Sequence, residues 1–296
     1  AERVNFKSYV LFMILFSIFI YAPLAHWTWH PEGFLFKMGV LDFAGGTVVH
    51  MSAGWAALAG AIYLKRRRDH VSGTFLPPAN IPFVLLGTGL LWFGWFGFNA
   101  GSAVGASPLA ASAFATTNTA AAGAGLAWVL FDVFMGKKVS ALGFCIGVVV
   151  GLVAITPACG FSGPMGAIVL GLLVSPVCFF FVTKVKSALG YDDALDVFGV
   201  HFVGGVIGAM GTGILVNPAL GGTGVYDYVA NAVGSYDMVA QLTSQAWAVG
   251  TTIVWSGVVA YIAYKVVDVL IGLRVSEEVE REGLDTTEHG ERAYHY

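Results

Sequence analysis

The chain has 296 residues, of which 57% are hydrophobic and 11% are charged, and its net charge is −3 at neutral pH. A soluble domain carries about 25% charged residues, and so few polar groups cannot cover a water-exposed surface. This composition excludes a soluble enzyme, a disordered chain and a nucleic-acid-binding protein. It predicts an all-α polytopic membrane protein, and the 39 glycines fit helices that pack closely in lipid.

Apolar stretches of about 20 residues are long enough to cross a bilayer as helices. The chain has eight such stretches, whose ends are defined only to within several residues. In chain order they are 9–27, 43–64, 81–100, 111–135, 139–158, 164–183, 196–216 and 240–272. The first is too long for the apolar part of a signal peptide, and no A-x-A cleavage site follows it.

The lysines and arginines predict the orientation of the chain. If the eight spans alternate, 13 of the 15 basic residues fall on one side, whereas Lys37 lies on the other and Lys265 lies inside the last span. Basic loops stay in the cytoplasm, so both ends are predicted to be cytoplasmic. Residues 1–272 then form the transmembrane domain, and residues 273–296 form a polar cytoplasmic tail.

Two histidines lie inside predicted spans, in similar segments of opposite direction. His50 follows Asp42 in DFAGGTVVH, and His201 follows Asp196 in DVFGVH. The spacings put each imidazole roughly 8–12 Å along its helix, so antiparallel helices could bring the two towards mid-membrane. An ionisable residue in a span indicates function, and paired imidazoles could line a path for a small polar molecule or pass a proton. The alternative is two core histidines, each bonded to a backbone carbonyl.

Asp42 and Asp196 each stand at the start of a predicted helix. A carboxylate there accepts hydrogen bonds from first-turn N–H groups and favours the positive end of the helix dipole. For Asp42, attraction of a cation to the outer mouth is a second interpretation, and both can hold. We expect Asp196 to be a cap and structural anchor.

Aromatic residues gather at the predicted outer ends of the spans. Trp27 and Trp29 lie in AHWTWHPEG, and Trp95, Phe98 and Ser102 lie in LLWFGWFGFNAGSA. Phe98 and Ser102 are four residues apart and share a helical face. One interpretation is the aromatic belt common at membrane interfaces. The other is a cation site, in which a tryptophan face and a hydroxyl hold a small ammonium-like ion.

No metal or cofactor site is expected. Cys145, Cys159 and Cys178 lie in or beside apolar runs, with no CxxC pair and no histidine at metal-ligand spacing. An intramembrane enzyme that uses His and Asp would be an alternative function, but neither a nucleophile elbow nor metal-ligand spacing supports it. We therefore expect no catalytic residues.

The segments DFAGGTVVH, WFGFNAGSA, ITPACGF, DVFGVH, TIVWSGVVA and GLRVSEEVEREGLD, in this order, resemble the ammonium transporter family (Amt/Mep/Rh). The resemblance covers nearly the whole chain and looks closest to the bacterial Amt branch. It implies an eleven-helix inverted-repeat fold and a homotrimer with one pore per subunit. The eight predicted spans match the fourth to eleventh helices, so the chain resembles a member that lacks its first three helices.

The resemblance also implies roles for the residues at the outer side. Trp29 and Ser102 match the outer ammonium-recruitment site. Phe98 matches the inner member of a stacked-Phe gate, whose outer member belongs to the missing third helix. Asp42 matches the aspartate that shapes the outer vestibule.

In the pore, His50 and His201 match the twin-histidine pair, and Trp95 matches a pore-lining residue. The implied function is ammonium transport across the inner (plasma) membrane: NH4+ is recruited outside and deprotonated, and NH3 passes the histidines with or without the proton. The tail after Gly272 matches a segment that couples subunits and responds to P-II signal proteins. The alternatives are an ammonium sensor without productive flux and an inactive truncated fragment.

Overall fold

A computed structural model describes residues 2–73, 77–227, 230–292 and 294 of the chain. The described part is mainly helical, which confirms the predicted all-α class. Among the described residues, six helical stretches are long and apolar enough to cross a membrane. They are Phe6–Lys37, Gly46–Leu64, Ile81–Ala103, Pro164–Leu189, Phe198–Leu215 and Met238–Ile271.

Each of the eight predicted spans corresponds to a helix, but two helices fall outside those six. α7 (Pro108–Phe134) is 27 residues long, and its Thr- and Asn-containing first half makes it less apolar. α8 (Ala141–Ile155) is apolar but has 15 residues, about 22 Å of helix against a hydrocarbon thickness of about 30 Å. The number of eight spans therefore stays a prediction.

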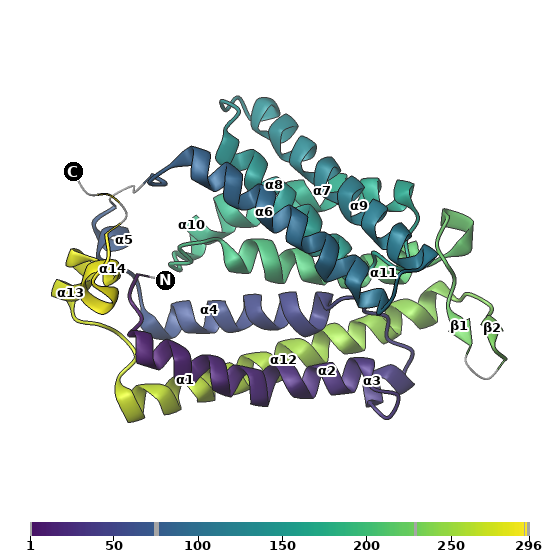
Figure 1. Ribbon diagram of the computed structural model, residues 1–296, viewed down its shortest axis with the longest axis horizontal. Helices are drawn as coiled ribbons and strands as arrows, with labels where there is room; N and C mark the ends of the chain where they lie inside the picture. Colours follow the sequence, from purple (N-terminus) through teal and green to yellow (C-terminus); the bar gives the residue numbers. More distant parts are fainter. Residues whose placement is uncertain (1, 74–76, 228–229, 293, 295–296) are drawn as a thin grey trace.

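The helices form two packed groups (Figure 1). The first group and its short connections comprise α1 (Phe6–Phe16), η1 (Ser17–Tyr21), α2 (Ala22–Trp29), α3 (Phe34–Lys37), η2 (Gly46–Met51), α4 (Ser52–Leu64), α5 (Arg68–Ser72) and α12 (Met238–Ile271). Phe12 of α1 stacks on Tyr264 of α12, with ring centroids 4.0 Å apart. The Ser256 hydroxyl of α12 donates to the Ser52 carbonyl of α4 at 2.9 Å. Apolar and hydroxyl contacts thus hold this group together.

The second group includes α11 and η5, which pack against the first group. Its elements are α6 (Ile81–Ala100), η3 (Gly101–Ala103), α7, α8, α9 (Pro164–Phe180), η4 (Phe181–Val185), α10 (Lys186–Leu189), η5 (Phe198–Phe202) and α11 (Val203–Leu215). Its backbones approach closely: a Cβ at Gly151 would lie 2.5 Å from the carbonyl oxygen of Ala120. The Ser175 hydroxyl donates to the Ala124 carbonyl at 2.9 Å. Small residues at helix crossings permit this packing.

Short elements complete the chain. They are η6 (Pro218–Leu220), β1 (Tyr226–Asp227), β2 (Ala232–Val233), α13 (Glu277–Glu282) and α14 (Leu284–His289). β1 and β2 pair antiparallel, with Tyr226 opposite Val233. Residues 228–229 of this connection lie outside the described residues.

Several long helices begin at side-chain caps that satisfy otherwise unpaired N–H groups. Asn80 accepts a hydrogen bond from Phe83 N–H before α6, and Ser107 accepts one from Ala110 N–H before α7. Asp237 accepts from two N–H groups at the start of α12. These capping side chains therefore mark where the three helices begin.

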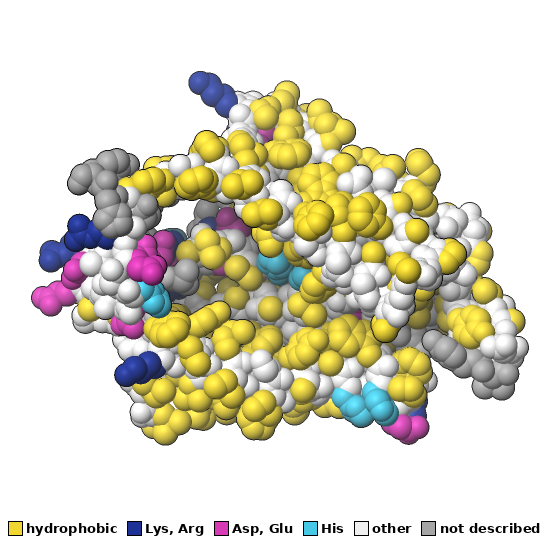
Figure 2. All heavy atoms as spheres, viewed as in Figure 1, with side chains coloured by type: hydrophobic (Ala, Val, Ile, Leu, Met, Phe, Trp, Pro, Cys, Tyr) yellow, Lys and Arg dark blue, Asp and Glu magenta, His cyan; other side chains and the backbone are white. Residues whose placement is uncertain are grey.

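Both termini lie at the same end of the helix bundle (Figure 1), as the alternation of spans predicts. Val4 pairs antiparallel with Arg274, and Asn5 N–H donates to the Leu273 carbonyl at 3.0 Å. Charged side chains gather at this end, whereas hydrophobic side chains cover much of the remaining face (Figure 2). The cytoplasmic location of this end stays a prediction.

Candidate functional site

His50 and His201 come from different helices and meet inside the molecule. His50 lies in the π-helical turn η2 before α4, and His201 lies in the π-helical turn η5 before α11. Their Nδ1 atoms are 3.3 Å apart, and the side chain of His50 is buried. The predicted approach of the two imidazoles is confirmed. Single π-helical turns inside helices occur frequently at functional sites.

Thr156 contacts His50 at the opposite ring nitrogen. This residue ends α8, and its Oγ1 lies 3.2 Å from Nε2 of His50. The same oxygen accepts a hydrogen bond from Trp95 Nε1 at 2.9 Å and is 2.7 Å from the Leu152 carbonyl oxygen. The sequence patterns did not single out Thr156, although it lies in the ITPACGF segment. A threonine in an apolar run gives no signal of which distant side chain it touches.

Aromatic rings from α6 form a wall against the histidine pair. The Trp95 and His50 rings are stacked, with centroids 5.2 Å apart. Phe98 lies 5.7 Å from His50 and 5.6 Å from Trp95 by ring centroids. The structure therefore brings together Trp95, Phe98, His50 and His201. Figure 2 shows a hollow between the two helix groups, with histidine side chains in its middle.

Asp42 caps the turn that carries His50. Its carboxylate accepts hydrogen bonds from the N–H groups of Gly45, Gly46 and Thr47 at 2.7–2.8 Å and from the Thr47 hydroxyl at 2.6 Å. The left-handed φ of +112° at Gly45 lets the chain fold back over the carboxylate. The capping role expected of Asp42 is confirmed. Its contribution to cation binding stays a prediction.

The other predicted outer residues are not joined to one another by direct contacts. The Trp29 indole donates to the backbone carbonyl of Asp42 at 2.7 Å, and Trp29 is 36% exposed. The Ser102 hydroxyl donates to the Phe98 carbonyl at 2.8 Å. Over the described residues, no hydrogen bond or ring contact links Trp29 to Phe98 or Ser102. The recruitment site thus stays a prediction.

The expected capping role of Asp196 is wrong. Asp193 accepts the hydrogen bond from Phe198 N–H, at 2.8 Å, at the start of η5. Asp196 has a left-handed φ of 56°, and its carboxylate pairs with Lys186 Nζ at 2.5 Å. Because the chain turns at Asp196 before the helix begins, an earlier carboxylate reaches the free N–H group. The expected role of Asp196 as a structural anchor stays a prediction.

A buried ion-pair network ties the segment before η5 to Arg67 and to Arg3 near the N-terminus. The Arg67 guanidinium binds both carboxylate oxygens of Asp192 at 2.9 and 3.0 Å, and Arg3 donates to the Asp192 carbonyl at 2.9 Å. Burial raises the pKa of Asp192, but the hydrogen bonds and charge of Arg67, together with the charge of Arg3, outweigh it and hold that pKa at about 2. The carboxylate therefore stays ionised at neutral pH.

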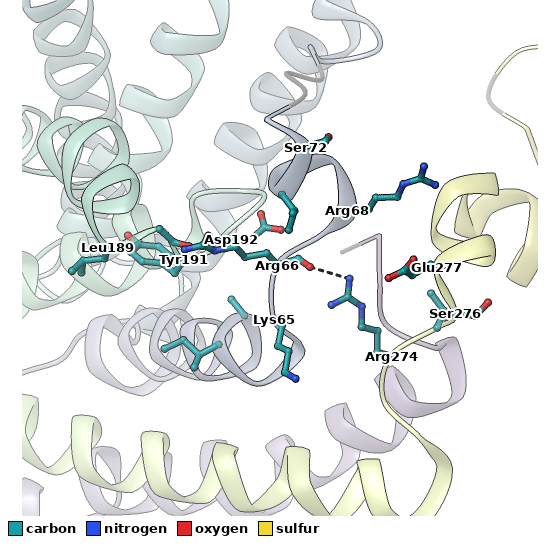
Figure 3. A pocket seen from close by; sticks show the side chains of 15 residues that line it. Lys65, Arg66, Arg68, Ser72, Leu189, Tyr191, Asp192, Arg274, Ser276 and Glu277 are labelled. Atoms are coloured by element: carbon teal, nitrogen blue, oxygen red, sulfur yellow. Dashed lines mark hydrogen bonds between the residues drawn. The ribbon is translucent and has the colours of Figure 1, made fainter.

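A separate cavity of about 1020 Å³ lies at the same end, lined by α4, α5, the segment before η5 and the tail. Figure 3 shows Lys65 and Arg68 pointing to different sides of it, while Arg274 donates to the backbone carbonyl of Arg66. None of the predicted pore residues lines this cavity. Its basic side chains diverge or bind backbone carbonyls, so they do not converge on one ligand position.

Comparison with known proteins places these features in a family. The model of the Ammonium Transporter Family matches residues 1–294. The ammonium transporter of Aquifex aeolicus is 47% identical over 99% of this chain and 66% of its own length, and that of Bacillus subtilis is 42% identical over 99% and 70%. The chain thus spans about two thirds of the length of these relatives.

Comparison with solved structures leads to the same family. A chain named "Sensor Amt Protein" superposes with a TM-score of 0.87 at 31% identity, covering 97% of this chain and 71% of that one. Saccharomyces cerevisiae Mep2 gives a TM-score of 0.82 at 34% identity, covering 93% of this chain and 62% of Mep2. By sequence and by fold, this chain belongs to the ammonium transporter family.

Proposed function

We propose that this chain forms the conducting part of an ammonium transporter and that the histidine pair lies on the path of the substrate. The observation that carries the proposal is the contact of two imidazoles, with Nδ1 atoms 3.3 Å apart, beside the rings of Trp95 and Phe98. A bare cation entering such an apolar passage pays a large desolvation cost, whereas ammonia can hydrogen-bond to imidazole nitrogen. NH4+ therefore loses its proton before NH3 passes His50 and His201, with or without that proton following.

The outer recruitment site belongs to the same proposal. Trp29 keeps its indole N–H on the Asp42 carbonyl, which leaves the ring face for a cation–π contact. Ser102 gives its hydroxyl hydrogen to the Phe98 carbonyl, so the lone pairs of its oxygen are available to ammonium. Asp42 acts by holding the η2 turn and the Trp29 indole in place. Phe98 acts as the gate between this site and the histidines.

The proposed setting is a multi-pass protein of the inner membrane with both ends in the cytoplasm. The clustering of basic side chains with both termini at one end of the bundle supports this orientation. We include in the proposal a homotrimer and a P-II signal protein that docks on the face formed by the tail and α5. Ammonium and ammonia are the substrates, and the lipid bilayer surrounds the helices.

An ammonium sensor is the second candidate, because a similar solved structure carries the name of a sensor. The full chain in proteoliposomes separates the two functions. Ammonium pulses that change the lumen pH or evoke a current indicate a transporter, and current indicates net charge transfer. Ammonium binding without either signal indicates a sensor. A chain that neither binds ammonium nor conducts refutes both.

A further inference from the structure

We propose that Thr156 is a positioning residue that fixes the tautomers of the histidine pair and leaves Nε2 of His201 as the ring nitrogen of the pair that is free to take up a proton. The tautomer assignment stands on hydrogen-bond geometry alone. Its consequence for transport rests on the proposed function.

The hydroxyl of Thr156 is the starting point, because it has one hydrogen and two lone pairs. The indole Nε1 of Trp95 is a donor only, so it occupies one lone pair at 2.9 Å. Two acceptors then compete for the hydroxyl hydrogen. The Leu152 carbonyl oxygen lies at 2.7 Å, and Nε2 of His50 lies at 3.2 Å.

The backbone hydrogen bonds at the end of α8 determine which of the two acceptors receives the hydroxyl hydrogen. The backbone N–H of Thr156 turns to the Val153 carbonyl at 3.2 Å and so does not serve the Leu152 carbonyl four residues back. Leu152 is fully buried, and the Thr156 hydroxyl supplies the hydrogen bond that its carbonyl would otherwise lack. Turning the hydroxyl to His50 would leave that carbonyl unpaired in the interior. The hydroxyl therefore donates to Leu152, and its second lone pair accepts from Nε2–H of His50.

The tautomers of both histidines follow from this bond. A neutral imidazole carries one hydrogen, so His50 with Nε2–H has a bare Nδ1 that can only accept. His201 must then donate from its own Nδ1 across the 3.3 Å contact. This leaves Nε2 of His201 bare. Within the described chain that nitrogen has no hydrogen-bond partner, and His201 is only partly buried.

In this arrangement, the histidine pair accepts a proton at Nε2 of His201. A proton from a bound ammonium ion adds to Nε2 of His201, which forms an imidazolium and leaves ammonia. His201 can pass its Nδ1 proton to Nδ1 of His50, which makes His201 neutral and puts the charge on His50. The proton goes no further, because the Thr156 oxygen already holds its own hydrogen and accepts hydrogen bonds from Trp95 and His50. It can leave the pair only through Nε2 of His201.

NMR of the full chain in bilayers, with isotope-labelled histidine nitrogen, tests this assignment at alkaline pH. The expected result is His201 with its hydrogen on Nδ1 and His50 with its hydrogen on Nε2, each signal identified by its loss in His201→Gln or His50→Gln. His201 with Nε2–H in the unmodified protein overturns the inference without any further variant.

Substitutions at position 156 test the cause. Thr156→Val keeps the shape but removes the acceptor, so the His201 Nδ1–H signal should fall, whereas Thr156→Ser should retain it. Thr212→Val is the matched control, since Thr212 is equally buried and bonds to the Gly208 carbonyl at 2.8 Å without touching either histidine. A Thr156→Val spectrum identical to the control overturns the positioning role. Expected tautomers together with a chain that moves no ammonium would instead refute the proposed function and leave the positioning role standing.

Discussion

Replacing Asp42 with alanine should destabilise the protein far more than an ordinary helix-cap substitution does. The change removes a carboxylate that is 5% exposed and accepts four hydrogen bonds at 2.6–2.8 Å. Three buried backbone N–H groups would lose their partner, and each unsatisfied group costs about 1–3 kcal/mol. Allowing for partial relaxation of η2, we expect a loss of about 3–5 kcal/mol in the free energy of unfolding.

The matched control is Asp237→Ala at the start of α12. Asp237 is exposed and caps two N–H groups at 2.9 and 3.1 Å. Water can replace it, so its loss should cost about 0.5–1 kcal/mol. Denaturant titration in mixed micelles, followed by tryptophan fluorescence, compares the two variants. Equal losses for Asp42→Ala and Asp237→Ala would refute the reasoning, because Asp42 would then be no more than a surface cap.

Two further predictions concern the ion-pair network and the close helix packing. Asp192→Asn should cost about 3 kcal/mol because it leaves the Arg67 guanidinium without its buried partner, whereas breaking the exposed Glu32–Lys37 pair with Glu32→Gln should cost about 0–1 kcal/mol. Arg67 and Arg3 hold the folded-state pKa of Asp192 at about 2. The contribution of Asp192 to the free energy of unfolding should therefore be complete above about pH 4 and fall as the pH drops towards 2. If the free energy of unfolding of Asp192→Asn depends on pH in the same way as that of the unmodified protein between these values, this reasoning is contradicted. Gly151→Ala should lower the unfolding midpoint by the equivalent of about 1–3 kcal/mol, because the added carbon would lie 2.5 Å from a carbonyl of α7. Gly250→Ala in α12, with open space at its Cβ, should instead be neutral or stabilising by up to about 1 kcal/mol, and equal effects at the two glycines would remove the packing argument.

The sequence predicted the helices well because each predicted span is a long apolar run, and such runs become helices whatever they pack against. The approach of His50 and His201 was also predictable, since two similar segments of opposite direction point to an inverted repeat. Both inferences depend on patterns within short stretches of chain. The orientation of the spans, inferred from the placement of lysine and arginine, stays a prediction.

The missed features depend on geometry that no local pattern encodes. Asp196 stands nearest the start of its helix in the sequence, yet a left-handed turn moves its carboxylate to Lys186 and gives the cap to Asp193. Thr156 is one threonine in an apolar helix, and its contacts with His50 and Trp95 are 106 and 61 residues away in the chain. Contacts of this range are set by how whole helices pack, so only a structure reveals them.

The measurement that tests the central claim most directly is ammonium-driven transport by the full chain in proteoliposomes, with evoked current and lumen pH recorded together. His50→Leu combined with His201→Leu is compared with the unmodified protein at equal amounts of folded protein. The account predicts that ammonium evokes transport in the unmodified chain and that the double variant loses any proton-coupled current, because an apolar pair offers no nitrogen to accept the proton. Undiminished current in the double variant would contradict the placement of the histidine pair on the substrate path.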